Sequence, residues 1–257
     1  MGGRTKIVGV MLAALLVLAG VAQANSLGQV SLKYVECDPK QAAYTYVDGV
    51  KKGPFYTGTY KLELDPAVQV GAEAVTLVES AAPSYVISSN CADLMEYAPG
   101  NFQLYDIYLP KDAPIGGGQG PMDPDRPADL RRLFDRHLGK VVDDNTAAAF
   151  QACVWEIIYE GTGDYDVNYL SDDKGTFYVE EYSGSDWRLT ANGWLDDLGT
   201  VDPDIGLRVL ANMGAQDYAI TIAGLGSRPV IPEPLTMLGV FLGVSSLAGY
   251  VRRKRPS

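Results

Sequence analysis

The chain downstream of residue 25 is organised in short runs in which apolar and polar residues alternate. The runs are rich in Tyr, Val and Thr, and turn-forming Gly, Pro and Asp residues separate them. An apolar period of two residues places one side of each run against a core, which is typical of antiparallel strands. We predict strands at residues 30–34, 44–47, 56–64, 75–78, 85–87 and 102–109.

Two later stretches change to the three- and four-residue spacing of amphipathic helices. The first helix is expected from Asp125 to Leu138, and the second from the N-cap candidates at residues 143–146 to Tyr159. Further strands are expected at residues 165–169, 175–182, 207–210 and 217–222, and a short helix at residues 194–198. Strands, helices and then strands again predict an α+β fold, with an antiparallel β-sandwich or barrel-like sheet and inserted helices.

The N-terminus has the layout of a secretory signal peptide. Arg4 and Lys6 precede an apolar run at residues 7–21, and Ala22-Gln23-Ala24 is a small-x-small cleavage sequence. Residues 1–24 are therefore predicted to be removed on export. The mature chain then lies in a compartment where disulfides persist.

The C-terminus combines three features within residues 227–257. Pro232, Glu233 and Pro234 are followed by an apolar run at residues 235–251 and then by the basic residues 252–255. A single apolar helix of this length spans about 25 Å. That is short for a stable transmembrane helix but sufficient to halt in a membrane with the basic end in the cytoplasm.

This tail closely resembles the PEP-CTERM sorting signal of exported proteins in Gram-negative bacteria. The resemblance implies an exosortase-type processing enzyme as a partner. It also implies transient anchoring of the C-terminal helix in the inner membrane, followed by localisation at the cell surface or in the extracellular matrix. The alternative is a plain single-pass anchor. When the predicted signal peptide and the sorting tail are excluded, residues 25–226 are expected to form one extracellular domain.

The chain is acidic, with 32 Asp and Glu against 21 Lys and Arg residues and a formal net charge of -11. Several of the basic residues belong to the two ends, so the central domain is more acidic still. Nucleic-acid binding requires basic side chains that displace counterions from phosphates. The composition therefore opposes a nucleic-acid partner.

Gln151 is an unusual residue in the second predicted helix. It lies on the apolar face with Val154 and Trp155, where burial of an amide without partners costs about 1–3 kcal/mol. One compensation is covalent, because a cysteine thiol can attack the Gln151 carbonyl carbon, expel ammonia and leave a thioester. An amine or hydroxyl of another molecule could then attack that bond once. This chemistry needs no turnover, metal or cofactor, so the chain is not expected to be an enzyme.

Two segments resemble the Cys-Gln thioester domains of bacterial surface adhesins. Phe150-Gln151-x-x-Val154-Trp155 matches the apolar-Gln-x-x-apolar-Trp motif of that family, and Cys91-Ala92-Asp93-Leu94 is similar to its cysteine segment. The resemblance implies a thioester between Cys91 and Gln151. The residues expected to support this bond are Asp93, Phe150, Val154 and Trp155.

The three cysteines leave more than one assignment open. If Cys91 is bonded to Gln151, Cys37 and Cys153 remain and could form a disulfide between the first strands and the back of the helix. Alternatively, Cys91 forms a disulfide with one of the other two, and Gln151 is a hydrogen-bonded core amide. The adhesin family usually has an aromatic or large apolar residue before the cysteine, where this chain has Asn90. Cys37 therefore stays a second candidate for the thioester.

Two other functions stay open. One is a non-covalent extracellular module that binds polysaccharide or matrix with the same fold and no thioester. The other is a secreted hydrolase with paired carboxylates, for which the candidates are Glu156 with Glu160 and Glu180 with Glu181. The acidic pairs at residues 172–173, 196–197 and 202–204 lack the Asp-x-Asp-x-Asp-Gly pattern of a calcium loop, so we expect solvated turns there and no metal site.

The interpretation that joins most of these features is an exported surface or biofilm-matrix protein. Its central domain is expected to attach once, through Cys91 and Gln151, to a target that bears an amine or a hydroxyl.

Overall fold

The computed structural model describes residues 26–114, 122, 124–160, 165–168, 176–181 and 186–226. The predicted signal peptide (1–24) and the sorting tail (227–257), with Pro232, Glu233 and Pro234, lie outside the described residues. These two assignments and the domain boundaries that they set stay predictions. Within the described ranges, no helix is both long and apolar enough to cross a bilayer.

Two long strands form the largest hairpin of the fold. β1 (Gly28–Val47) and β2 (Val50–Val70) pair antiparallel across a turn at Asp48-Gly49, where both residues have positive φ, 52° and 74°. Asp and Gly are the residues that tolerate this left-handed backbone in a two-residue hairpin. Four register shifts interrupt the pairing, and such irregularities bend strands. The runs predicted as separate strands are therefore parts of two continuous, bent strands.

Five further strands complete an antiparallel sheet. They are β3 (Val86–Cys91), β4 (Gln103–Tyr108), β5 (Phe177–Glu181), β6 (Leu207–Asn212) and β7 (Ala215–Thr221). The order β2-β3-β7-β6-β4-β1, together with the pairing of β1 with β2, closes the sheet on itself, and β5 adds to the far end of β1. The predicted α+β class and its barrel-like antiparallel sheet are confirmed.

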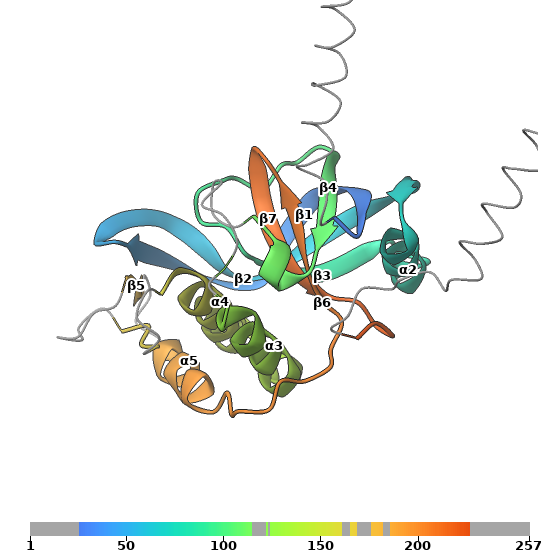
Figure 1. The fold of residues 1–257 in the computed structure, drawn as a ribbon. Helices are drawn as coiled ribbons and strands as arrows, with labels where there is room; N and C mark the ends of the chain where they lie inside the picture. Colours follow the sequence, from blue (N-terminus) through green and yellow to red (C-terminus); the bar gives the residue numbers. More distant parts are fainter. Residues whose placement is uncertain are drawn as a thin grey trace, which may run out of the picture.

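The helices are inserted between these strands. α2 (Ala72–Ala81) connects β2 to β3, α3 (Arg126–His137) and α4 (Asp144–Tyr159) precede β5, and α5 (Trp187–Asp196) precedes β6. Two short 3-10 helices, η1 (Pro110–Asp112) and η2 (Leu138–Lys140), flank α3. α3, α4 and α5 form one group beside the sheet, and α2 lies apart from them (Figure 1). α4 is the central helix, because it packs against β1, β2, α3 and α5.

α4 begins where the sequence predicts. The N-cap residue Asp143 accepts the N–H of Thr146 at 2.8 Å, and Thr146 Oγ1 accepts the N–H of Asp143 at 3.0 Å. This reciprocal capping satisfies donors that the first turn of a helix leaves free. The cap fixes the start of the helix and, about two turns later, the direction of Gln151.

Three predicted elements are wrong in type or extent. The strand predicted at residues 75–78 belongs to α2, because a short apolar run does not distinguish a strand from a buried helix. Its buried residues recur at helical spacing and are Glu73, Ala74, Leu77, Val78 and Ala81. The helix predicted at residues 194–198 is α5, which begins earlier, at Trp187. In the stretch predicted as a strand at residues 165–169, the described part forms one isolated bridge, between Asn168 and Val179.

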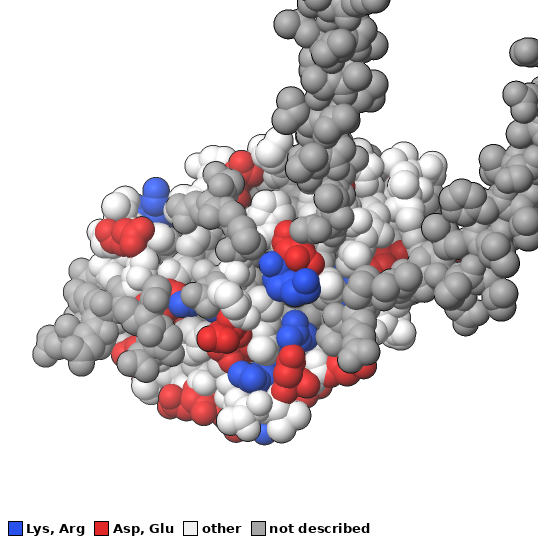
Figure 2. Space-filling view, in the orientation of Figure 1, with Lys and Arg blue, Asp and Glu red and all other residues white. Residues whose placement is uncertain are grey.

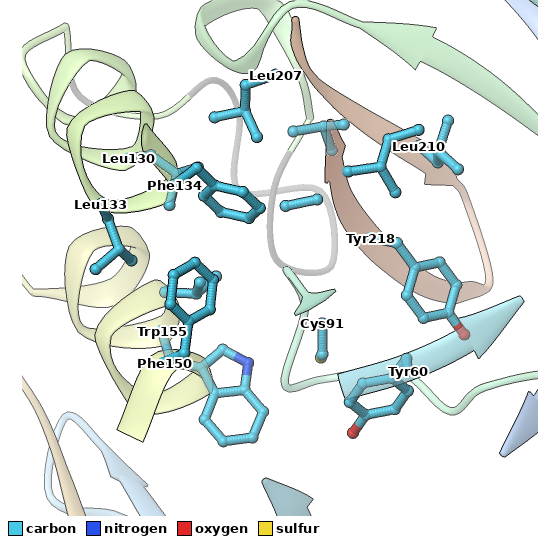
Figure 3. Close-up of a cluster of buried hydrophobic side chains, with 14 of the residues drawn as sticks. Tyr60, Cys91, Leu130, Leu133, Phe134, Phe150, Trp155, Leu207, Leu210 and Tyr218 are labelled. Atoms are coloured by element: carbon cyan, nitrogen blue, oxygen red, sulfur yellow. The ribbon is translucent and has the colours of Figure 1, made fainter. Parts of the chain in front are cut away.

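The space between the sheet and the grouped helices is an apolar core. Figure 3 shows side chains of α3 and α4 facing side chains of β6 and β7, with Cys91 and Tyr60 at one end of the cluster. The labelled helix residues are Leu130, Leu133, Phe134, Phe150 and Trp155, and the labelled strand residues include Leu207, Leu210 and Tyr218. Burial of each large side chain stabilises the fold by about 1.5–3 kcal/mol. The end of β3 that carries Cys91 is therefore part of the core.

The surface around α3 carries paired charges. On the face drawn in Figure 2, acidic and basic side chains lie side by side. Arg131 binds Asp202 at 2.6 Å and Arg136 binds Asp197 at 3.0 Å, which joins α3 to the segment before β6. Exposed ion pairs contribute about 0–1 kcal/mol each. These ion pairs add little stability, but they place a carboxylate beside the charge of each arginine.

Candidate functional site

Gln151 projects from the middle of α4 into the interior and meets the end of β3. Its side chain is fully buried. Nε2 donates to the backbone O of Cys91 at 2.8 Å, and Oε1 accepts the backbone N–H of Cys91 at 2.9 Å. The amide thus pairs with Cys91 as a neighbouring strand would, and both of its polar ends have a partner. The fold brings together the two residues that the sequence singles out, although 60 positions separate them.

Cys91 is the last residue of β3 and pairs with Tyr218 of β7. Its thiol donates to the backbone O of Asp93 at 2.8 Å. Gln216 of β7 places Nε2 at 2.8 Å from the sulfur, as a donor. The backbone of Cys91 is therefore fixed by Gln151 of α4, whereas its sulfur is fixed by β7 and by the turn that follows β3.

Burial governs the acidity of the Cys91 thiol. The residue has no exposed surface, so loss of solvation raises its pKa far above the ordinary value. The indole N–H of Trp155 points toward the sulfur (Figure 3) and lowers this pKa in part, without forming a hydrogen bond of standard geometry. The thiol is neutral at physiological pH. An attack of this thiol on Gln151 would therefore depend on orientation rather than on a preformed thiolate.

The amide oxygen of Gln151 has a second donor. Asn90, directly before Cys91, is 3% exposed, and its Nδ2 lies 3.3 Å from Gln151 Oε1. Two donors on one carbonyl oxygen draw electron density from the carbonyl carbon, which is the atom that a thiol attacks.

Asp93 shapes the turn that follows Cys91. Its side chain is buried, and Oδ1 accepts the N–H of Met95 at 2.7 Å and the hydroxyl of Tyr159 at 3.3 Å. The same hydroxyl accepts the N–H of Leu94 at 2.9 Å. These bonds fix the backbone O of Asp93, which accepts the Cys91 thiol. Asp93 is therefore a positioning residue.

The apolar residues predicted to support Gln151 are all fully buried. Trp155, one turn further along α4, borders the thiol. Phe150 packs edge-on against Phe134, with 5.0 Å between the ring centroids, and so lies at the contact of α4 with α3. Val154 lies in the same buried segment of α4. Of the three, Trp155 interacts with the Cys91 thiol, and Phe150 supports the helix that carries Gln151.

The candidate disulfide between Cys37 and Cys153 is not formed in the structure, where all three cysteines are free thiols. Cys153 faces α5, where its thiol donates to the backbone O of Ala191 at 3.3 Å. Cys37 lies in β1 opposite Tyr60 of β2. The two-residue step from Gln151 to Cys153 turns their side chains to different sides of α4, so the helix that directs Gln151 to the sheet directs Cys153 away from it. The alternative disulfides of Cys91 are also absent.

Both remaining cysteines are protected by burial. Loss of solvation raises the pKa of the Cys37 thiol to about 12 and that of the Cys153 thiol well above its ordinary value. A protonated, buried thiol is a poor nucleophile and a poor partner for disulfide exchange. The odd number of cysteines is therefore accommodated by burial rather than by pairing.

The carboxylates considered for hydrolysis do not form an open acid pair. Glu156 and Glu160 point into the interior, where each accepts a backbone N–H, and burial raises the pKa of Glu156 well above its ordinary value. Glu180 binds Lys51 at 2.6 Å on the surface, and the side chain of Glu181 lies outside the described part. Among the residues that the structure describes, no group of three or more His, Cys, Asp or Glu is placed to hold a metal ion. Residues 172–173 are not among them.

The sequence patterns assign no role at the site to three residues that contact it. Asn90 stands out in the sequence only as a departure from the adhesin pattern, because the pattern ends the strand at residue 87, whereas β3 continues to Cys91. Tyr159 follows Gln151 by eight positions, so helical spacing could have placed it on the same side of α4. Gln216 carries no local signal, because only the pairing of β3 with β7 brings it to the sulfur.

The chain has no match among the models of known protein families, and no curated protein matches it. One solved structure that is similar is the N-terminal thioester domain of a surface protein from Clostridium perfringens. It shares 16% sequence identity, and the match covers 74% of this chain and 99% of that chain with a TM-score of 0.36. A likeness of this size does not carry a function from one protein to the other.

Proposed function

We propose that this chain is an exported protein that forms an internal thioester between Cys91 and Gln151 and uses it once to attach to another molecule. One observation carries the proposal: the buried Gln151 side chain is bonded to both backbone groups of Cys91, at 2.8 and 2.9 Å. This arrangement keeps the amide carbonyl carbon beside the residue that bears the thiol, which makes the attack effectively intramolecular.

The reaction balances without an added reagent. The Cys91 sulfur adds to Gln151 Cδ, the thiol proton passes to Nε2, and the carbon–nitrogen bond breaks to release ammonia. An amine of the target later adds to the same carbon. It forms an amide and returns the proton to the sulfur, so the Cys91 thiol is free again. A target hydroxyl would give an ester in the same way. Because the Gln151 nitrogen is not replaced, the protein reacts once and is not an enzyme.

Because water hydrolyses a thioester, a buried site protects the proposed bond. Cys91, Gln151 and Trp155 have no exposed surface, so hydrolysis is slowed until a target reaches the site. The predicted signal peptide and the PEP-CTERM-like tail provide the route by which the domain is exported. In this proposal, an exosortase-type enzyme processes the tail after transient anchoring in the inner membrane, and the domain acts at the cell surface or in the biofilm matrix.

A non-covalent polysaccharide-binding module is the second candidate, and a group of tyrosines favours it. Tyr56 is 55% exposed on the long hairpin. On β1, Tyr46 stacks on Tyr178 at 4.5 Å, and the Lys51 ammonium lies 3.8 Å from the ring centroid of Tyr44. Partly exposed aromatic rings with polar tips are suited to a wet, amphipathic ligand. In this case Gln151 is a core amide with satisfied hydrogen bonds.

Methylamine distinguishes the two candidates. If the thioester forms, the purified mature protein takes up one methylamine, and peptide mapping places it on Gln151. Cys91→Ala should fold and take up none, whereas Cys153→Ala, the matched change of a buried thiol on the other side of α4, should react like the wild type. Uptake that persists in Cys91→Ala contradicts the proposal. Absence of uptake by wild type, with polysaccharide binding intact, favours the second candidate.

A further inference from the structure

Asn90 places a polar side chain where an apolar residue would pack at lower cost. It is 3% exposed, and its backbone pairs with Ala219 of β7. Burial of an unpaired amide costs about 1–3 kcal/mol on mutational scales. Its Nδ2 lies 3.3 Å from Gln151 Oε1, the same atom that accepts the Cys91 N–H at 2.9 Å. The two donors converge on one oxygen, from adjacent residues of one strand.

From this convergence we infer that Asn90 Nδ2 and the Cys91 N–H form an oxyanion-binding pair that accelerates both formation of the thioester and its attack by an amine. The inference rests on the proposed thioester function and adds a catalytic residue to it. Asn90 qualifies as catalytic because it contacts an oxygen bonded to the reacting carbon.

The chemistry places negative charge on this oxygen twice. When the Cys91 sulfur adds to Gln151 Cδ, the carbon becomes tetrahedral and Oε1 becomes an oxyanion until ammonia leaves. When an amine adds to the thioester, the same oxygen becomes an oxyanion until the sulfur leaves. Fixed N–H donors in a site without water stabilise such charge more than they stabilise the neutral carbonyl. The 3.3 Å bond is long for the ground state, and catalytic hydrogen bonds commonly shorten only as the reaction proceeds.

The geometry also assigns different tasks to the other donors. Gln151 Nε2, the leaving nitrogen, donates to the backbone O of Cys91. Gln216 Nε2 lies at the sulfur, which gains negative charge as it leaves during amine attack. The Asn90 side chain thus donates a hydrogen bond to the oxygen, and the Gln216 side chain donates one to the sulfur. Substitution of Asn90 should therefore affect both steps through the carbonyl oxygen alone.

The test compares Asn90→Leu and Asn90→Asp with the wild type as complete mature proteins. The readouts are the fraction of molecules lighter by one ammonia and the second-order rate of methylamine uptake. Ser89→Ala is the matched control, since Ser89 is a buried neighbour on β3 whose hydroxyl donates to Tyr60 O at 3.2 Å. Circular dichroism reports whether each variant is folded.

Asn90→Leu removes the donor, and loss of one oxyanion donor slows reactions by about a hundredfold. We expect this loss in methylamine uptake, while Ser89→Ala reacts at the wild-type rate. Asn90→Asp adds a readout that a structural role would not give. An ionised Asp cannot donate, but a protonated Asp can, so its rate relative to wild type at the same pH should recover as the pH is lowered from 8 to 5.

The outcomes separate a failure of the role of Asn90 from a failure of the proposed function. A wild type that carries the thioester, with a folded Asn90→Leu that reacts within threefold of it, overturns the role of Asn90 and leaves the proposed function intact. If Asn90→Leu fails to fold, the Asn90→Asp rate ratio decides, and a ratio independent of pH overturns the inference. A wild type without a thioester overturns the proposed function and this inference together.

Discussion

A buried amide is tolerated in a core only when both of its polar ends are paired, and Gln151 meets this condition through the backbone of Cys91. Those hydrogen bonds would also be present in a purely structural glutamine. What distinguishes this site at the residue scale is the surroundings of the pair: a neutral thiol, a second donor on the amide oxygen from Asn90, and a donor on the sulfur from Gln216. Each of these groups matches an atom whose charge changes during thioester chemistry.

Asp217, next to Gln216 on β7, gives the first prediction. Burial, together with the nearby carboxylates of Asp93 and Glu96, raises the pKa of its carboxyl to about 8, although the hydrogen bond from the Asn212 N–H lowers it in part. The unfolded value is about 4, so between pH 4 and 8 the unfolded chain is ionised here while the folded chain stays protonated. The free energy of unfolding should therefore fall as the pH rises through this window, by up to about 5 kcal/mol, and then level off.

Asp217→Asn removes this titration and keeps an acceptor for the Asn212 N–H, which Asp217 Oδ1 binds at 2.9 Å. Melting temperatures measured from pH 4 to 9 should fall less steeply for the variant than for the wild type. Asp202→Asn is the control, because Arg131 lowers the pKa of Asp202 and its effect on stability is confined to acid below that window. Equal slopes for Asp217→Asn and the wild type contradict the assignment.

The cysteines give the second prediction at this scale. Because Cys37 and Cys153 are free thiols, a phosphine reductant should leave the melting temperature of the mature protein unchanged. A native disulfide would instead contribute about 2–5 kcal/mol, which reduction would remove. A clear fall in melting temperature after reduction, with one cross-linked cysteine peptide before it, would show that the free-thiol assignment is wrong.

At the scale of elements, a buried ion pair joins α2 to the sheet. Arg208 of β6 binds Glu73 of α2 through two bonds, Nε to Oε2 at 2.5 Å and Nη2 to Oε1 at 3.0 Å, and both residues are buried. Such a bidentate pair has strict geometry. Removal of one partner leaves the other charge buried without compensation.

Glu73→Gln should therefore lower the free energy of unfolding by about 3–5 kcal/mol. Glu79→Gln, an exposed change on the same helix, should stay within about 0.5 kcal/mol of the wild type. Urea unfolding followed by circular dichroism measures both. If Glu73→Gln is as stable as Glu79→Gln, the pair does not anchor α2.

The elements also show how far sequence patterns reach. α3 and α4 were predictable because caps and helical periodicity are local, and the face of Gln151 follows from that periodicity alone. α2 was not predictable, because the run at residues 75–78 fits a strand equally well until its contacts are known. The choice of Cys91 depended on a family resemblance. The places of Asn90 and Gln216 depended on the length of β3 and on its pairing with β7, which no local pattern encodes.

At the scale of the whole molecule, the predicted export signal, the closed sheet with inserted helices and the predicted sorting tail fit the proposed protein that attaches once. The closed sheet brings β3 and β7 together, and the central helix α4 covers the sheet with Gln151 directed at Cys91. A rigid frame is required, because two groups from distant parts of the chain must stay in contact for the thioester to form.

The intact mass of the purified mature protein tests this account most directly. We predict a mass lower than that of the sequence by one ammonia, restored to the full sequence mass in Cys91→Ala after correction for the substitution and unaffected by Cys153→Ala. A wild-type mass equal to that of the reduced sequence, in protein that is folded and has not been exposed to amines, would contradict the thioester.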